Sequence, residues 1–372
     1  MTSIPNARTS AIVDPLARRL PVTVITGFLG SGKTTLLRRL LRHPGMDRAA
    51  VIINEFGEVA IDHELVAASS EHMTLLSNGC LCCTLRTDLQ ETLRELFVKR
   101  RAGEVIDFDR VFVETTGLAD PIPVLHTLQT DGLLGAQYRL NGVVTLVDAV
   151  NGIGQLDAMP EASKQAAVAD RLVLTKTDIA DRNLVDRVQR RLVALNPFAP
   201  ITKAINGEID PELLANIGPH SVTARSEELG RWLNVIVPEP RRPEAGDFLR
   251  QRIALETGAH DASIHAFCLW FDQAFTWDGL NAALQALTSL RGPDLLRVKG
   301  IVHVAGEPGP VVLQGAQHVF HPPVTLERGH DTDPRSRIVF IVRNIPRQSI
   351  EALFSAVGAL GSGAGPTFRT PN

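Results

Sequence analysis

The stretch Gly27-Phe28-Leu29-Gly30-Ser31-Gly32-Lys33-Thr34-Thr35 fits the phosphate-binding pattern G-x-x-x-x-G-K-[ST]. The apolar, β-branched segment Pro21–Ile25 precedes it and predicts a buried strand. A predicted helix follows, with an apolar face made by Leu36, Leu37, Leu40 and Leu41 and an end at His43-Pro44-Gly45. A chance glycine-rich turn would lack these two flanks. The stretch therefore predicts a nucleotide-binding domain.

Each part of this loop has an expected role at the phosphates. The glycines at Gly27, Gly30 and Gly32 let backbone N–H groups close around phosphate oxygens, and the helix that begins there adds its positive end. Lys33 is expected to neutralise the β and γ phosphates, and the Thr34 hydroxyl to bind Mg²⁺. Ser31 and Thr35 complete the predicted nucleotide-binding set.

The composition sets limits on the function. With 372 residues, 44% of them hydrophobic, the chain can bury a large core and form two domains. A formal net charge of −3 gives no electrostatic case for nucleic acid as a partner. No apolar run approaches the ~20 residues of a membrane span, so no membrane segment is expected. Three of the four cysteines lie within four positions, which is not a disulfide framework and fits a cytoplasmic protein.

An acidic segment follows the second predicted strand, Val51–Ile53. It runs from Asn54 to Asp62 and carries Glu55, Glu58 and Asp62. In P-loop hydrolases a segment at this place in the chain can reach the γ-phosphate and its Mg²⁺ and change shape on hydrolysis. The three carboxylates are therefore candidates for a magnesium, second-metal or water-positioning role, although each could also be an ordinary loop carboxylate.

The cysteine cluster is Cys80-Leu81-Cys82-Cys83, on a predicted loop ahead of a helix, a position that favours the metal-binding thiolate. Three sulfur atoms suit Zn²⁺ or a similarly soft ion. A tetrahedral site needs a fourth ligand, from the acidic segment, water or a partner protein. Such an open site suits delivery better than structural zinc, which four protein ligands normally enclose. The alternative is a set of buried or redox-active thiols.

A further carboxylate ends the predicted strand Asp109–Val113, in Glu114-Thr115-Thr116-Gly117. At this position a P-loop protein holds the water shell of Mg²⁺, and the following glycine can donate its N–H to the γ-phosphate. Strands are also predicted at 141–147 and 171–174. A helix is predicted before each of them, at 121–128 and at 161–169. This alternation predicts a mainly parallel sheet covered by helices.

The last motif of this half is Thr175-Lys176-Thr177-Asp178. Asp178 can accept two hydrogen bonds from guanine N1–H and N2–H₂, which adenine cannot donate, and Lys176 can lie along the base. Coming in order after the phosphate loop and Glu114, the motif predicts guanine as the base.

These five motifs together resemble the CobW family of P-loop GTPases, metallochaperone relatives of the nickel-insertion GTPases. The matching segments are Gly27–Thr35, Asn54–Glu58, Cys80–Cys83, Glu114–Gly117 and Thr175–Asp178. The resemblance implies GTP hydrolysis coupled to binding and transfer of a transition metal, often zinc or cobalt. One position departs from the family pattern: Thr175, with a single hydroxyl, stands where the guanine motif usually begins with Asn.

The predicted fold is a P-loop NTPase with a doubly wound, mainly parallel sheet, followed by a smaller α+β domain. Segments 295–300 and 314–318 of the second domain also resemble the C-terminal domain of the CobW family. The expected divisions are a loose lead-in at 1–19, a GTPase domain at 20–218, a linker at 219–261, the C-terminal domain at 262–357 and a disordered tail at 358–372.

The sequence thus predicts a GTPase that carries a transition metal to a client metalloprotein. Lys33, Glu58, Asp62, Glu114 and Gly117 are the expected catalytic groups, and Cys80, Cys82 and Cys83 the metal ligands. Cysteine ligation favours Zn²⁺, while Co²⁺ accepts the same geometry. A homo-oligomer is compatible with the sequence. Two alternatives stay open: a sensor that docks to a partner when nucleotide and metal are bound, and a small-molecule kinase.

Overall fold

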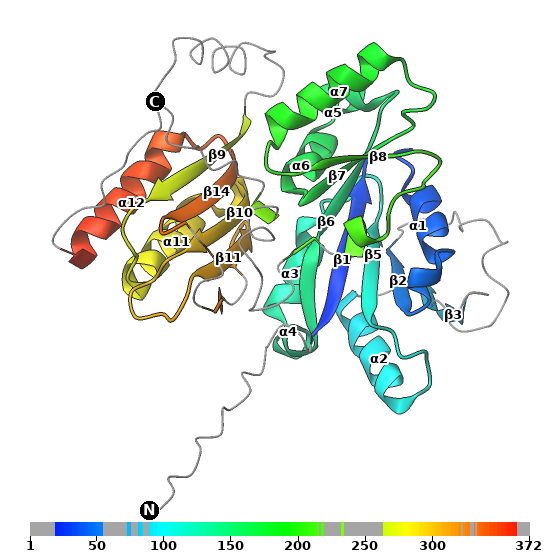
Figure 1. Cartoon of the computed structure of the whole chain (residues 1–372), viewed down its shortest axis with the longest axis horizontal. Helices are drawn as coiled ribbons and strands as arrows, with labels where there is room; N and C mark the ends of the chain where they lie inside the picture. Colours follow the sequence, from blue (N-terminus) through cyan, green and yellow to red (C-terminus); the bar gives the residue numbers. More distant parts are fainter. Residues whose placement is uncertain are drawn as a thin grey trace, which may run out of the picture.

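Two β-sheets, one from each half of the chain, organise the protein (Figure 1). The computed structural model describes residues 19–54, 73–75, 81–84, 89–215, 217–218, 232–233, 263–320, 323–327, 331 and 333–362. Among these residues, no helix is both long and apolar enough to span a membrane.

The first sheet has the strand order β3-β4-β2-β5-β1-β6-β7-β8, and every neighbouring pair is parallel except β3 with β4. Strand β1 lies between β5 and β6, where the strand order reverses. In open parallel sheets, ligands bind outside the carboxyl ends of the strands at such a point. The strands are β1 (Leu20–Gly27), β2 (Ala49–Asn54), β3 (Met73–Leu75), β4 (Leu81–Thr84), β5 (Arg110–Thr115), β6 (Tyr138–Asp148), β7 (Arg171–Thr175) and β8 (Ile201–Ala204).

Helices cover both faces of this sheet, because its strands are apolar on both sides. On one face, the leucines of α1 share a buried cluster with Ile25 and Val51. On the other, α2, α3 and α6 pack on Val24 and Val113. The helical elements are α1 (Lys33–Leu41), η1 (Pro44–Met46), α2 (Leu89–Ala102), α3 (Ile122–Thr130), α4 (Gly132–Gln137), α5 (Gly152–Ala158), α6 (Pro160–Val168), α7 (Arg182–Leu195) and α8 (Glu212–Ala215). The predicted doubly wound fold is confirmed.

The second sheet is antiparallel, in the order β12-β11-β10-β14-β9, with β13 paired to β11. Leu280 and Leu284 of one helix and Phe354 of another pack on one face of it, which makes the predicted α+β unit. Its elements are β9 (Ile264–Phe271), α11 (Trp277–Arg291), η2 (Gly292–Asp294), β10 (Leu295–Val302), β11 (Val311–Ala316), β12 (Val319–Phe320), β13 (Val324–Thr325), β14 (Ser336–Arg343) and α12 (Arg347–Ser362).

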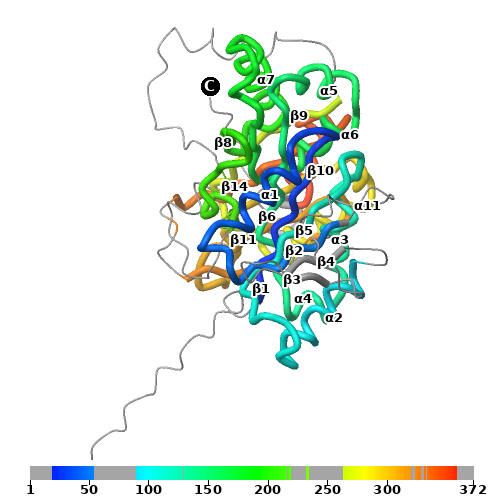
Figure 2. Tube along the Cα trace, turned by 90° about the vertical axis from the view of Figure 1, so that its right-hand side faces the viewer, coloured from blue at the N-terminus to red at the C-terminus, as the bar shows by residue number. Residues whose placement is uncertain are grey.

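The opposite face of the second sheet lies against the first domain (Figures 1 and 2). Ile264, Leu296, Ala316 and Ile341 belong to the same buried cluster as the apolar side chains of α3 and α6. Trp232 packs beside them, against Ile301 and Val339. The two sheets therefore share one continuous apolar core.

A buried ion cluster also joins the two halves. Asp170, between α6 and β7, is 3% exposed, and Arg297 and Lys299 of β10 are 0% and 2% exposed. Arg297 Nη2 donates to both carboxylate oxygens of Asp170, at 2.9 and 2.8 Å. Lys299 Nζ lies 2.6 Å from Asp170 Oδ1, and the amide of Val143 donates to Oδ2 at 2.8 Å. One carboxylate is thus saturated by two cations.

The cluster holds two cations for one carboxylate, so one positive charge is in surplus. Burial opposes the charge on Asp170, yet Arg297 and Lys299 lower its pKa to about 2. The pKa of Lys299 is lowered as well, because burial and the neighbouring guanidiniums of Arg297 and Arg171 outweigh its attraction to Asp170. Since Arg297 already contacts both carboxylate oxygens, Lys299 is the surplus positive charge of the cluster.

Two features differ from the sequence-based expectations. Helix α12 continues past Gly358, where the tail was expected to begin, and ends at Ser362. The short helices α4 and α5 were not predicted. The linker expected at 219–261 lies outside the described residues except for Trp232 and Leu233, as does the lead-in at 1–18.

Candidate functional site

The carboxyl edge of the first sheet brings together most of the predicted site. Strand β1 ends at Gly27, β5 at Thr115 and β7 at Thr175, and parallel pairing places these ends side by side. Between them, β6 ends at Asp148. The phosphate loop, Glu114 and the guanine motif therefore lie next to one another at the carboxyl edge of the sheet.

The phosphate loop folds as a turn around the start of α1. Gly32 is the residue before that helix and has φ of 92°, a left-handed conformation that favours glycine. Lys33 is buried, and its Nζ donates to the carbonyl oxygens of Gly27 at 2.9 Å and Phe28 at 3.4 Å. The Ser31 hydroxyl is fully buried and has no hydrogen-bond partner within the described part of the chain. A cation and an unused hydroxyl facing a turn of backbone N–H groups fit a bound polyphosphate.

Strand β5 brings its end against the phosphate loop. Glu114 is 6% exposed and pairs in register with Ile25 of β1, and the Thr115 hydroxyl donates to that of Thr26 at 2.7 Å. Beyond them, a Cβ atom on Gly117 would lie 2.6 Å from Leu29 Cδ2 and 2.8 Å from Leu29 N, so only glycine allows this approach. Glu114 and the Thr34 hydroxyl supply hard oxygen atoms of the kind that Mg²⁺ prefers.

The guanine motif divides into a part that supports the phosphate loop and a part that is open to a base. The Thr175 hydroxyl donates to the carbonyl oxygen of Ser31 at 2.8 Å, so it holds the loop. Lys176 follows with φ of 58°, and its Nζ lies 2.8 Å from Asp148 Oδ2. Asp178 is exposed.

Asp148 is a residue of this site that the sequence reasoning missed. Its side chain is 1% exposed, and it accepts hydrogen bonds from Lys176, from the Asn151 side chain and from the Val150 amide. Burial opposes its charge, but these donors outweigh burial and lower its pKa. It therefore fixes Lys176 as a charged partner. A carboxylate directly after an apolar strand, the signal that identified Glu114, would have found it.

The cysteine segment lies further across the same sheet. Cys82 and Cys83 are in strand β4 rather than in the predicted loop, because β4 pairs with β2 on one side and β3 on the other. The register places Cys83 in one row with Ile52, Val113 and Val24. Three steps between strands separate β4 from β1, a span of about 14 Å. Cys80 lies outside the described residues.

The acidic segment begins at the same edge. Asn54, the last residue of β2, pairs with Thr115 of β5. Glu55, Glu58 and Asp62 lie beyond it, outside the described residues. Within the described part of the chain, no three His, Cys, Asp or Glu side chains gather as metal ligands would. Cys268 lies in β9 of the second sheet, away from the cysteine segment, and burial raises the pKa of its thiol to about 12.

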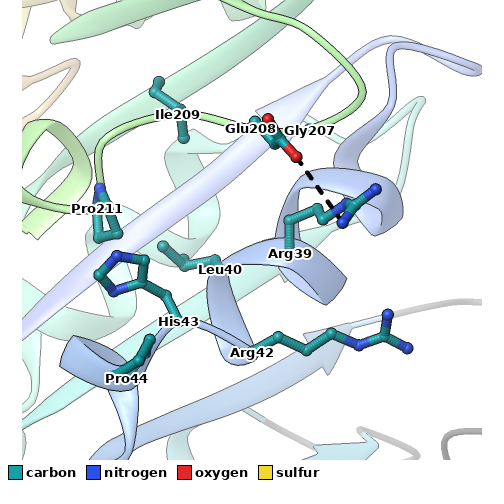
Figure 3. A pocket seen from close by; sticks show the side chains of 9 residues that line it. All are labelled: Arg39, Leu40, Arg42, His43, Pro44, Gly207, Glu208, Ile209 and Pro211. Atoms are coloured by element: carbon teal, nitrogen blue, oxygen red, sulfur yellow. Dashed lines mark ion pairs between the residues drawn. The ribbon is translucent and has the colours of Figure 1, made fainter.

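An open cavity of about 330 Å³ lies at the C-terminal end of α1, away from the phosphate loop, where the segment after β8 rests on this helix (Figure 3). Leu40, His43 and Pro211 line it, and Arg39 Nη1 lies 3.9 Å from Glu208 Oε1 at its rim. Both charged side chains are half or more exposed, so this pair adds little stability. The cavity shows that the segment after β8 is seated on the helix that carries Lys33.

Comparison with known proteins gives two family matches in this chain. Residues 21–203 match the CobW/HypB/UreG nucleotide-binding domain, and residues 264–358 match the cobalamin synthesis protein cobW C-terminal domain. The zinc chaperone YjiA of Escherichia coli is 33% identical over 345 residues, covering 93% of this chain and 99% of YjiA. The zinc chaperone CobW of Pseudomonas aeruginosa is 30% identical over 365 residues, covering 89% of this chain and 90% of that protein.

Solved structures give the same result. The chain is similar to the crystal structure of the Zn(II)-bound YjiA GTPase from E. coli, with a TM-score of 0.68, 32% identity and coverage of 91% of this chain and 99% of that one. A Zn(II)-bound variant of YjiA, with one glutamate and two adjacent cysteines replaced by alanine, gives a TM-score of 0.69 at 31% identity, again covering 91% and 99%.

Proposed function

The chain belongs to the CobW/HypB/UreG family of nucleotide-binding proteins, and from this premise we propose that it is a GTP-hydrolysing metallochaperone. In this proposal it binds Zn²⁺ at Cys80, Cys82 and Cys83 and transfers it to a client metalloprotein. The observation that carries the proposal is the layout of the first sheet. The phosphate loop on β1 and the cysteines on β4 belong to one hydrogen-bonded sheet, with only β5 and β2 between them.

GTP hydrolysis in this site rests on positioning and charge. Lys33 exchanges its contacts with the loop carbonyl oxygens for the β and γ phosphates, and the free Ser31 hydroxyl becomes available to the phosphates. The Gly117 N–H is the donor for the γ-phosphate. Mg²⁺, when bound, neutralises phosphate charge, and Thr34 and Glu114 are the residues that would hold it, directly or through water.

Guanine is the proposed base, with Asp178 as its acceptor. Asp178 is exposed, two residues after Lys176, where it can accept hydrogen bonds from the base edge. Thr175 acts on the phosphate loop instead of the base, so the missing Asn of the family motif affects loop support more than base choice. ATP is the discriminating competitor, since a small-molecule kinase would prefer it.

The metal site is proposed from the cysteines and the acidic segment. Two relatives are named zinc chaperones, which supports zinc as the cargo. In this chain the only adjacent cysteines are Cys82 and Cys83. Three thiolates and one carboxylate, from Glu55, Glu58 or Asp62, complete a tetrahedral set for Zn²⁺, and Co²⁺ accepts the same geometry.

Two strands connect the nucleotide to this metal site. Strand β2 is hydrogen-bonded to both β5, which carries Glu114, and β4, which carries the cysteines. Strand β3 follows the acidic segment in the chain and pairs directly with β4, opposite Cys82 and Cys83. A change of the acidic segment on GTP hydrolysis therefore reaches the cysteine strand from both sides, which loosens the metal for transfer.

The test is Zn²⁺ affinity of the purified protein with GDP and with a non-hydrolysable GTP analogue. We expect tighter binding with the analogue, and loss of this difference in the Cys82→Ser/Cys83→Ser variant. Cys268→Ser is the matched control and should behave as the parent. Equal Zn²⁺ affinity in both nucleotide states would reject coupling between the two sites. Equal affinity in the parent and the double variant would reject the cysteines as ligands.

A further inference from the structure

Helix α6 holds the loop that follows Glu114. Gln165 Nε2 donates to the carbonyl oxygens of Gly117 at 3.2 Å and Ala119 at 2.9 Å. Lys164 Nζ, one residue earlier, lies 2.6 Å from Asp120 Oδ2. The Gln165 side chain is 1% exposed, so losing these bonds would leave buried polar groups without partners. The position of the Gly117 loop is thus tied to the position of α6.

The far end of α6 is tied to the C-terminal domain. The helix packs against β10 (Figure 2). Asp170, two residues after the helix ends, forms the buried cluster with Arg297 and Lys299 of that strand. Because the cluster is desolvated, pulling Asp170 away from its cations is costly. A shift of α6 therefore carries β10 with it.

Hydrogen bonds from neighbouring side chains stabilise α6, so the helix is expected to move as a rigid unit. The Asn196 side chain, which is 1% exposed, donates to the carbonyl oxygens of Ala166, Ala167 and Ala169 at 2.9 to 3.1 Å. It thereby caps the C-terminal end of a helix too short to be stable alone. The Thr145 hydroxyl donates to the Gln165 carbonyl oxygen at 2.7 Å.

A second contact runs through α3. The Asp120 carboxylate accepts from the Ile122 amide at the start of this helix, at 3.0 Å. One turn on, His126 Nε2 lies 3.4 Å from the carbonyl oxygen of Ala316 in β11. Helix α3, which follows the Gly117 loop, and helix α6, which is hydrogen-bonded to it, thus both contact the second sheet.

We propose that Gln165 is a positioning residue that couples the Gly117 loop to the C-terminal domain, so that the nucleotide in the phosphate loop changes how the second sheet is docked. This rests on the proposed GTP binding. Gly117 touches Leu29, so a γ-phosphate held by the phosphate loop displaces or fixes the Gly117 carbonyl oxygen. The Gln165 Oε1 atom is buried without a hydrogen-bond partner among the described residues, which gives the amide an acceptor for a loop N–H when the loop moves.

The tryptophans allow a direct test. Trp232, Trp270 and Trp277 are the tryptophans of the chain, and all lie outside the nucleotide-binding match at 21–203. Trp232 is 5% exposed, and its ring centroid lies 5.5 Å from Lys299 Nζ in the ion cluster. Any nucleotide-dependent change in tryptophan emission must therefore come from beyond the nucleotide domain.

The experiment compares tryptophan emission of the full chain with GDP and with a non-hydrolysable GTP analogue, both with Mg²⁺, and measures nucleotide affinity by calorimetry. We expect a difference in emission for the parent and none for Gln165→Met, an isosteric variant without the donor. Nucleotide affinity of the variant should change no more than about fivefold, because the two hydrogen bonds that are lost go to the Gly117 loop and not to the nucleotide. Gln155→Met is the control and should give the same emission difference as the parent. Gln155 also donates to a loop of the site, at the Leu29 carbonyl oxygen, but it does so from α5 and not from α6.

Each outcome is decisive. Equal emission in both states, from a parent that binds both nucleotides, overturns the coupling and leaves the proposed function standing. A parent that binds no GTP overturns both. A full response in Gln165→Met overturns the role of Gln165. Lys164→Met is a second variant for the case that Gln165→Met does not fold. It removes a partly exposed ion pair to the same loop, at little cost in stability. It should give a reduced response, and a full response in both variants overturns the proposal.

Discussion

Replacing Asp170 by asparagine removes the carboxylate of the interdomain cluster and leaves Arg297 and Lys299 buried without a counter-charge. Removing one partner of a buried ion pair costs about 3–5 kcal/mol of folding free energy. Part of this follows from the titration of Asp170. Lowering its pKa from 3.8 to about 2 stabilises the ionised, folded chain by about 2 kcal/mol at neutral pH.

Lys299→Met should behave in the opposite way. Because Lys299 is the surplus cation and its pKa is lowered, its charge is held at a cost. Methionine keeps the volume of the side chain, and the lost contact to the carbonyl oxygen of Trp232, at 3.4 Å, is weak. We expect Lys299→Met to change the free energy of unfolding by about 1 kcal/mol or less, in either direction.

The assay is urea unfolding followed by tryptophan emission, with circular dichroism to check that both signals give one transition. The pH dependence supplies a second check. The folded-state pKa of Asp170 lies below the unfolded-state value, so its contribution is present above about pH 4 and is lost as the pH falls through the folded value. The stability difference between the parent and Asp170→Asn should therefore shrink by about 2 kcal/mol between about pH 5 and about pH 2.

Two results would refute this reasoning. If Lys299→Met destabilises the chain as much as Asp170→Asn, Lys299 is a required partner and not a surplus charge. If Asp170→Asn costs less than about 1 kcal/mol, the cluster is hydrated and resembles a surface ion pair.

Three further substitutions test the site and its support. Lys33→Met removes the cation of the phosphate loop and should weaken GTP binding about 10- to 100-fold in calorimetry; unchanged affinity would exclude the loop as the phosphate site. Thr175→Val removes the hydroxyl that holds Ser31 and should weaken GTP and GDP about fivefold each, with an unchanged preference over ATP in competition; a changed preference would show that Thr175 contacts the base. Asn196→Leu removes the side-chain donor to three carbonyl oxygens at the end of α6 and should lower the free energy of unfolding by about 2–3 kcal/mol in urea; a loss below about 0.5 kcal/mol would show that the cap is dispensable.

Much of the fold could be predicted because local pattern and final structure agree. Strand β1 contains the predicted strand Pro21–Ile25, and β7 contains the predicted range 171–174. Predictions failed where distant pairing decides the structure. Cys82 and Cys83 follow a glycine and are expected in a loop, but strands β2 and β3 extend them. Helix α12 passes Gly358, since one glycine costs a helix only about 1 kcal/mol.

The site divides in the same way. The ends of apolar strands identified Glu114 and Thr175, because parallel strands align their carboxyl ends. Gln165 and Asp170 carry no such signal. Gln165 lies within a helix and contacts residues 46 and 48 positions away, and Asp170 pairs with Arg297 across 127 positions. Only the folded chain shows what these side chains touch.

The apolar core shared by the two sheets has a practical consequence for truncation experiments. The nucleotide-binding half covers Ile264, Leu296, Ala316 and Ile341. Either fragment expressed alone would therefore expose an apolar surface to water and would carry one side of the Asp170–Arg297 ion pair without its partner. Such fragments should aggregate. A loss of activity on deleting the C-terminal half would then reflect a destabilised nucleotide-binding fragment. The contribution of the C-terminal half is better measured by single substitutions in the intact chain.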